Sequence, residues 1–146
     1  MKMSLHLYRL IIIILIVLPI PISSCHLFGP PNPPEIIQIT GIDPKGDLIM
    51  EDVGGKSARI FNVKAGTTIN WQLKNSDISS IDKIYKKTTL PSDDLFKTGP
   101  SRIGNSKNWT ATIDQEAKPE QFEEYNIDWT GKDSSKHTYD PRIQVK

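Results

Sequence analysis

The chain has 146 residues, with 18 lysines and arginines against 17 aspartates and glutamates and a formal net charge of +1. This near balance argues against a nucleic-acid partner, because binding to a phosphate backbone favours a clear excess of basic residues. The chain has one cysteine, so an internal disulfide is excluded and the fold has to rest on its hydrophobic core. The length suits one domain with a single core.

The first 24 residues have the layout of a secretory signal peptide. "MKMSLHLYR" carries Lys2 and Arg9 and no acidic residue, and the apolar run "LIIIILIVLPI" follows it. Pro19 and Pro21 interrupt this run before it reaches the ~20 apolar residues that a membrane-spanning helix needs. We therefore expect residues 1–24 to be removed. The remaining 122 residues then carry 16 basic against 17 acidic residues, a formal charge of −1.

The only cysteine stands at the end of this segment, in "ISSC". An aliphatic residue, two small residues and a cysteine resemble the bacterial lipobox. The resemblance implies cleavage between Ser24 and Cys25, and a thiol that carries diacylglycerol with fatty acids such as palmitate. A lone exported thiol without a disulfide partner is reactive, so acylation explains Cys25 better than a free thiol behind an ordinary signal peptide, which is the alternative. Two or more acyl chains hold a protein on a membrane stably.

Residues 25–34 comprise Cys25 and a proline-rich tether. Its four prolines, at positions 30, 31, 33 and 34, oppose helix and favour an extended polyproline conformation. At about 3.1 Å per residue, such a segment holds a domain roughly 30 Å from the lipid surface. No acidic residue closely follows Cys25. By analogy with other bacterial lipoproteins, we expect an anchor in the cell envelope, on the periplasmic face of the outer membrane.

Residues 35–146 alternate apolar and polar positions, with turn residues between the runs. This pattern predicts an all-β domain, an antiparallel β-sandwich of seven or eight short strands. One segment, "DQEAKPEQFEE" at 114–124, could form a helical turn. The predicted strands are Glu35–Thr40, Asp47–Asp52, Ala58–Val63, Thr67–Leu73, Ile81–Lys87, Asn108–Ile113, Glu124–Thr130 and Arg142–Val145.

The three tryptophans are predicted to lie in the core. Exposed tryptophan rings would suit a sugar-binding platform, but the alternation places Trp71 on one face with Ile69 and Leu73. In the same way, Trp129 shares a face with Tyr125 and Ile127. Trp109 aligns with Ala111 and Ile113, although its strand could lie at an edge. Burial is therefore the preferred interpretation for all three rings.

The stretch "FNVKAGTTINWQLKN" resembles an early strand pair of cupredoxins and of related immunoglobulin-like sandwiches. The closing stretch "EEYNIDWTGKDSSKHTYDPRIQVK" is similar to their last hairpin. The whole chain resembles small lipoproteins of Bacteroidota-type bacteria with such a domain. A type 1 copper site needs two histidines and a cysteine thiolate. The sequence departs from cupredoxins here, because Cys25 and His26 lie in the tether and only His137 lies in the closing loop. We expect no copper centre and no other cofactor.

Two functional hypotheses remain from the sequence. The first is a non-catalytic binding or structural module that presents loops such as Leu90–Asn105 to another envelope protein or to a polysaccharide. The alternative is a small metal-binding protein or enzyme that uses His137, Asp140 and acids of nearby loops. No "GxSxG" motif occurs, and the adjacent acid pairs Asp93–Asp94 and Glu123–Glu124 are interpreted as solvated side chains. The first hypothesis requires no residue that the chain lacks.

Overall fold

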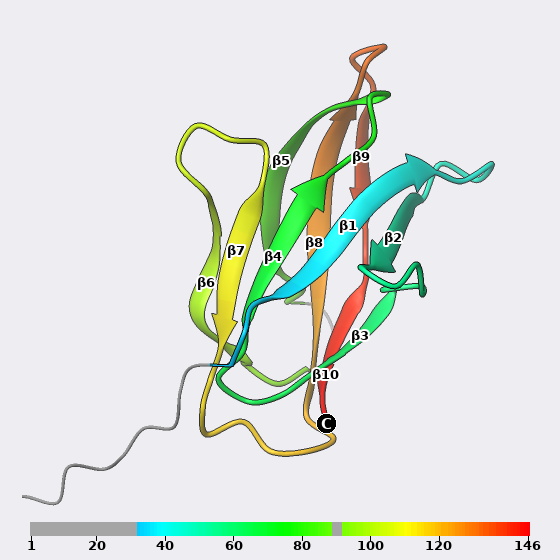
Figure 1. The fold of residues 1–146 in the computed structure, drawn as a ribbon. Coiled ribbons are helices and arrows are strands. Elements are labelled where there is room, and N and C mark those ends of the chain that lie inside the picture. The colour runs from blue at the N-terminus through cyan, green and yellow to red at the C-terminus, as the bar shows by residue number, and fades with distance from the viewer. Residues whose placement is uncertain (1–31, 89–91) are drawn as a thin grey trace, which may run out of the picture.

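The fold was analysed in a computed structural model, which describes residues 32–88 and 92–146. Cys25 and most of the tether lie outside these residues. Ten strands and no helix occur in the described part of the chain, and Figure 1 shows their arrangement. The strands are β1 (Glu35–Ile42), β2 (Leu48–Asp52), β3 (Ile60–Val63), β4 (Thr68–Leu73), β5 (Ile78–Lys86), β6 (Phe96–Arg102), β7 (Trp109–Ile113), β8 (Phe122–Gly131), β9 (Lys136–Tyr139) and β10 (Arg142–Val145).

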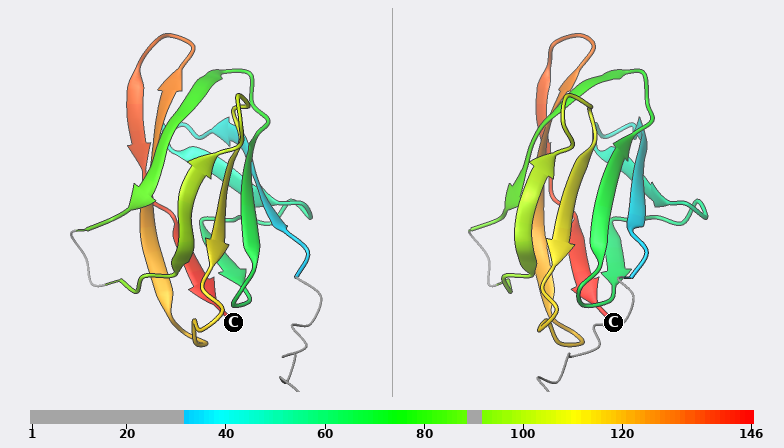
Figure 2. Two further views of the ribbon diagram at one scale, coloured as in Figure 1. Left: turned by 90° about the vertical axis from the view of Figure 1, so that its left-hand side faces the viewer. Right: turned by 60° about the vertical axis from the view of Figure 1, so that its left-hand side comes forward.

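The strands form two five-stranded sheets that lie against each other as layers (Figure 2). The first sheet has the order β2-β1-β4-β7-β6. The second has the order β3-β10-β8-β5, and β9 also pairs with β8. β9 and β10 pair with successive parts of β8, β9 with Ile127–Thr130 and β10 with Phe122–Glu124. Pro141 stands between them and has no N–H to donate to a ladder. This arrangement is a β-sandwich-like all-β fold.

Two pairings are parallel, so the expectation of a purely antiparallel sandwich is wrong at these places. β1 runs parallel to β4, with Ile37 opposite Trp71, and β3 runs parallel to β10, with Phe61 opposite Ile143. Parallel neighbours need a crossover connection, whereas antiparallel neighbours need only a hairpin. The connection from β1 to its parallel neighbour β4 passes through β2 in the first sheet and β3 in the second.

The sequence predicted most strands within a few residues, but it missed β6 and β9. β6 contains Gly99 and Pro100, which disfavour strand, and its pairing with β7 is irregular at two points. β9 has only four residues and begins with Lys136 and His137. β6 is stabilised as a strand by its pairing with β7, and β9 is stabilised by its pairing with β8. The possible helical turn at 114–124 is not observed, and this segment forms turns followed by the start of β8.

The core lies between the two sheets, and it confirms the predicted burial of the tryptophans. Trp71, Trp109 and Trp129 are 1%, 8% and 2% exposed. Strand β8 alternates strictly, so Tyr125, Ile127 and Trp129 all face inward. Burying one large apolar side chain contributes about 1.5–3 kcal/mol, and such contributions have to stabilise this domain without a disulfide among its described residues.

Side chains of the first sheet also donate hydrogen bonds to β5, the edge strand of the second sheet. The pairing of β5 with β8 shifts register between Ile81 and Lys83. The carbonyl of Ile81 accepts hydrogen bonds from Arg102 Nη2 at 2.9 Å and from Trp109 Nε1 at 3.3 Å. Trp109 is therefore anchored at the join between the two sheets.

Candidate functional site

The sequence hypothesis singled out His137 and Asp140, and the structure does not bring them together. The carboxylate of Asp140 lies 2.7 Å from Lys87 Nζ, and this hydrogen bond is the main cause that raises the pKa of Lys87. His137 borders cavities around Trp129, whereas Asp140 borders a separate one beside Arg142. In the described ranges, no group of three or more histidines, cysteines and acids is placed to hold a metal ion.

His137 lies on β9 directly opposite Trp129 of β8. Its imidazole stacks on the indole, with ring centroids 4.3 Å apart and planes 18° from parallel. The expectation that His137 lies in a closing loop is therefore wrong, because it belongs to β9 and its ring is half-buried against Trp129. Sequence reasoning missed this contact because it did not predict β9.

A short hydrogen-bonded chain connects His137 to the turn between β8 and β9. The hydroxyl of Ser135 donates to Asp133 Oδ1 and lies 2.7 Å from His137 Nε2. A hydroxyl has one proton, so Ser135 accepts the second bond from an Nε2–H of His137. The hydrogen bond from Ser135 is also the main cause that lowers the pKa of Asp133.

This order differs from that of a catalytic triad. In a triad, histidine accepts the serine proton and aspartate orients the histidine. Here Ser135 stands in the middle and donates its hydrogen bond to Asp133. These hydrogen bonds of Ser135 hold the turn in place.

Gly131 allows this turn to close tightly. A Cβ at Gly131 would lie 2.7 Å from Asp133 Oδ1 and 3.0 Å from Ser135 Oγ. The backbone N–H of Gly131 donates to the Ser135 carbonyl, and Ser134 adopts a left-handed φ of 68°. A side chain at position 131 would displace the carboxylate that holds Ser135.

A groove of about 310 Å³ lies beside this turn, and we call it the hairpin groove. Its walls come from the ends of β1 and β8, from His137 of β9, and from the loops that follow β1, β4 and β8. Strands β1, β4 and β8 all run toward this end of the domain (Figure 1). Lys132 N donates to the Asp77 carbonyl at 2.9 Å and so ties the β8–β9 turn to the β4–β5 loop. Side chains that line it include Ile42, Asp77, Trp129, Lys132, Ser135 and His137.

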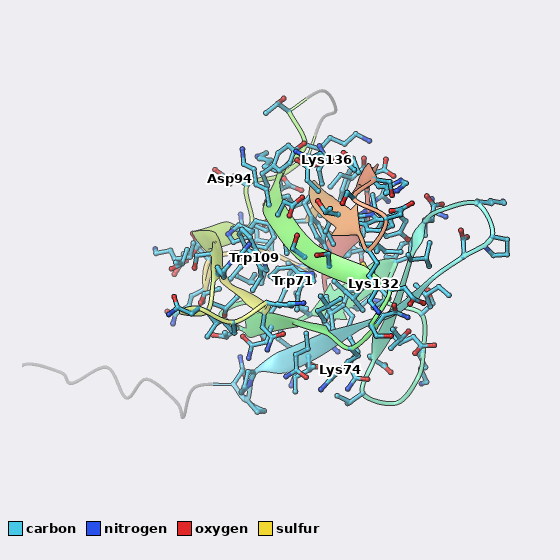
Figure 3. All side chains as sticks on the ribbon, turned by 90° about the horizontal axis from the view of Figure 1, so that it is seen from above. Trp71, Lys74, Asp94, Trp109, Lys132 and Lys136 are labelled. Atoms are coloured by element: carbon cyan, nitrogen blue, oxygen red, sulfur yellow. The ribbon has the colours of Figure 1, made fainter. Side chains whose placement is uncertain are left out.

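Figure 3 looks down on this end of the molecule. The labelled lysines at this end are Lys132 and Lys136 of the β8–β9 hairpin and Lys74, which follows β4. These lysines are exposed, and none of the ion pairs found in the described residues includes them. The ion pairs instead involve Lys86, Lys87, Lys97 and Arg142.

The acid pairs proposed from the sequence also lie apart from this groove. Asp93 accepts from Phe122 N at 2.9 Å and from Gln121, so it caps the start of β8. Glu124 pairs with Arg142 at 2.6 Å. The expectation of a solvated Glu123 is wrong, because Glu123 is 0% exposed and accepts from Leu95 N at 2.7 Å. Burial raises the pKa of Glu123.

The loop predicted at Leu90–Asn105 is also different in the structure. Residues 96–102 form the edge strand β6, and residues 89–91 lie outside the described ranges. Residues 92–95 and the 103–108 connection between β6 and β7 remain outside the strands. The segment therefore completes a sheet over much of its length.

No protein-family model matches the chain, and no curated protein matches it in sequence. Within the described residues, no helix is long and apolar enough to cross a membrane.

Proposed function

We propose that this protein is a lipid-anchored lipoprotein of the cell envelope that acts as a non-catalytic binding module. The signal-like segment, "ISSC" and the proline-rich tether support lipid attachment at Cys25. We place the anchor on the periplasmic face of the outer membrane, and the partner is another envelope protein or a polysaccharide.

The observation that carries this proposal is the position at which the tether joins the domain. β1 starts at Glu35, at the end of the molecule opposite to the β8–β9 hairpin (Figure 1). A lipid on Cys25 would therefore hold the hairpin groove on the side that faces away from the membrane. This orientation suits a module that meets its partner in the space beyond the lipid surface.

The contacts of the candidate residues support binding rather than catalysis. Asp140 pairs with Lys87, and Ser135 donates to Asp133. These contacts hold side chains in position and create neither an activated nucleophile nor a proton donor beside a cleft.

We further propose that the sandwich is of the cupredoxin-like or immunoglobulin-like type. Parallel neighbours β1 and β4 in one sheet, and β3 and β10 in the other, are compatible with the cupredoxin-like variant. The final segment, β8 to β10, is compatible with the closing hairpin that the sequence resembles.

Metabolic labelling with a palmitate analogue tests the anchor. We expect label on the parent protein and none on Cys25→Ala, because the thiol is the acyl acceptor. Ser24→Ala is the matched control, since it keeps a small residue before the cysteine and should retain label. Label on Cys25→Ala, or no label on the parent protein, would refute the lipoprotein proposal. Fractionation of the labelled cells then distinguishes the inner from the outer membrane.

A further inference from the structure

The outer faces of the two sheets differ in charge. In the first sheet, β4 lies between β1 and β7, and the central outward positions of these three strands carry no charged residue. In the second sheet, the outward positions of β8 include Glu124 and Asp128, and β10 adds Arg142. We call the uncharged surface the neutral face. Ile36 is its one apolar residue, and its polar residues, all half-buried, are Gln38, Thr68, Asn70, Gln72, Thr110 and Thr112.

The strand register makes the neutral face one continuous patch. In the parallel pair of β1 and β4, Gln38 lies opposite Gln72. In the antiparallel pair of β4 and β7, Asn70 lies opposite Thr110. Neighbouring strands are about 4.8 Å apart, so side chains that lie opposite each other on one face are neighbours. The face therefore offers hydrogen-bonding groups in rows that cross three adjacent strands (Figure 1).

The polar groups of the neutral face are hardly used inside the protein. The hydroxyls of Thr68 and Thr112 lie 3.4 Å apart, which is a long contact, and no other hydrogen bond of the six polar side chains occurs in the described part of the chain. The second sheet differs, because Asp128 on its outer face accepts a hydrogen bond from Thr138 at 2.7 Å. The donors and acceptors of the neutral face are thus available to water or to a partner.

The composition of the neutral face favours an uncharged, polar partner. Depletion of charged residues is typical of the central part of binding surfaces. The hydroxyl group of threonine and the amide groups of asparagine and glutamine can both donate and accept hydrogen bonds. The hydroxyl groups of a neutral sugar can do the same, so the two surfaces match in hydrogen bonding. An anionic polymer would gain no ion pair from these residues.

A protein partner fits this surface less well. The central parts of protein–protein interfaces are enriched in aromatic residues, methionine and arginine, and the neutral face has none of these. Aromatic rings are also absent from the exposed large apolar side chains of the described residues, so a sugar would not be held by stacking. One hydrogen bond contributes only a modest free energy, and several sugar units therefore have to bind together. This favours a polysaccharide over a single sugar.

We propose that the neutral face binds an uncharged polysaccharide, whose hydroxyl groups exchange hydrogen bonds with Gln38, Asn70 and Gln72. This inference rests on the proposed function as a binding module and names the class of its ligand. It differs from a platform of exposed tryptophan rings, because the contact is made by amide and hydroxyl groups on the outside of the first sheet.

The side-chain amide resonances test this directly in the full-length protein, labelled with ¹⁵N and solubilised in a detergent without a sugar headgroup. The probes are oligosaccharides of about six units from β-1,4-glucan, β-1,3-glucan, α-1,6-glucan, mannan and chitin. Each is added to roughly 10 mM, well above a Kd of about 1 mM. We expect at least one probe to shift the amides of Gln38, Asn70 and Gln72. The amide of Asn126, on the outer face of β8, should stay in place.

Two variants and one matched control link binding to the neutral face. Asn70→Ala and Gln72→Ala should each weaken binding about two- to tenfold, the effect of one hydrogen bond. Both side chains lie on the outside of the sheet, so the fold should persist. Asn126→Ala removes an amide that is equally half-buried, but from the outer face of the second sheet, and it should leave the affinity unchanged.

Each other outcome would overturn the inference. No shift of the three amides with any of the five probes would mean that the face does not bind a neutral polysaccharide. Equal shifts with an oligogalacturonate would refute the neutral class, and shifts on raising the protein concentration without a probe would assign the face to a second copy of the chain. Unchanged affinity in both variants would place the binding elsewhere. A protein that carries lipid but binds no probe would refute only this inference, and one that binds a probe without lipid would refute only the proposed anchor.

Discussion

The indole N–H of Trp71 donates a hydrogen bond to the hydroxyl of Tyr125 across the core, at 3.1 Å. Trp71 belongs to β4 in the first sheet and Tyr125 to β8 in the second. The two rings also meet edge to face, with centroids 5.6 Å apart, and Phe96 completes the cluster. This polar contact links the two sheets through the middle of the core. Burial also raises the pKa of the Tyr125 phenol, so the hydroxyl remains protonated at neutral pH.

We expect Tyr125→Phe to destabilise the protein by about 1–3 kcal/mol, because it leaves the buried N–H of Trp71 without an acceptor. Urea unfolding followed by tryptophan fluorescence measures the change. Tyr85→Phe is the matched control, since the hydroxyl of Tyr85 is only half-buried and makes a long bond of 3.4 Å to Asp128. Equal stability of the two variants would contradict the role of the buried bond.

Deleting either of the most buried tryptophan rings should have a larger effect. Trp71→Ala and Trp129→Ala should each cost about 3–5 kcal/mol, the usual range for removing a buried aromatic side chain. This loss approaches the whole stability of many small domains, so thermal melting should show a large decrease or no folded protein. Val53→Ala, at a position 70% exposed, serves as the control and should change stability by less than about 0.5 kcal/mol. Melting temperatures near that of the parent protein would show that the rings are not packed in the core.

The buried carboxyl of Glu123 should make stability depend on pH. Burial raises its pKa in the folded protein above the unfolded value, which is near 4.3 for an ordinary glutamate. A raised pKa means that the folded state binds the proton more tightly than the unfolded state. The contribution is therefore complete below the unfolded pKa, and it is lost as the pH rises through the folded pKa.

The variant Glu123→Gln isolates this contribution. Its side-chain carbonyl can still accept from Leu95 N, but the group does not ionise. We expect the stability of the parent relative to Glu123→Gln to fall as the pH rises from about 4 toward 8. Chemical unfolding of both proteins across this range measures the difference, in which the contributions of the other carboxylates largely cancel. A difference that stays constant with pH would show that Glu123 titrates alike in both states.

The turn between β3 and β4 depends on Gly66. Its φ is +73°, and an added Cβ would lie 3.1 Å from Gln115 Cγ. We expect Gly66→Ala to destabilise the protein by about 1–2 kcal/mol, the cost of a left-handed backbone for a residue with a Cβ. Gly99→Ala on β6 is the control, because a Cβ there has no atom within 4 Å and φ is not in that region. A melting temperature lowered equally by both substitutions would argue against the backbone as the cause.

The alternation of apolar and polar residues predicts the buried side of most strands, and β8 is the clearest case. In β8, alternate positions from Tyr125 to Trp129 are apolar, and the strand is buried at these positions. A period of two encodes the buried face locally, because successive side chains of a strand point to opposite sides. The turn before β4 also has a local cause, since Gly66 permits a backbone that other residues avoid.

Packing between distant segments sets which strands are neighbours and where single polar groups lie. β6 and β9 are strands because β7 and β8 supply their hydrogen bonds, and neither segment has a strong pattern of its own. Glu123 shares the inner face of β8 with Tyr125, but its burial depends on the start of β8 at Phe122, two residues before the predicted start of this strand at Glu124. The hairpin groove combines Ile42, Asp77 and Trp129, which are far apart in the sequence. Such contacts depend on how distant segments pack, and local periodicity carries no information about that packing.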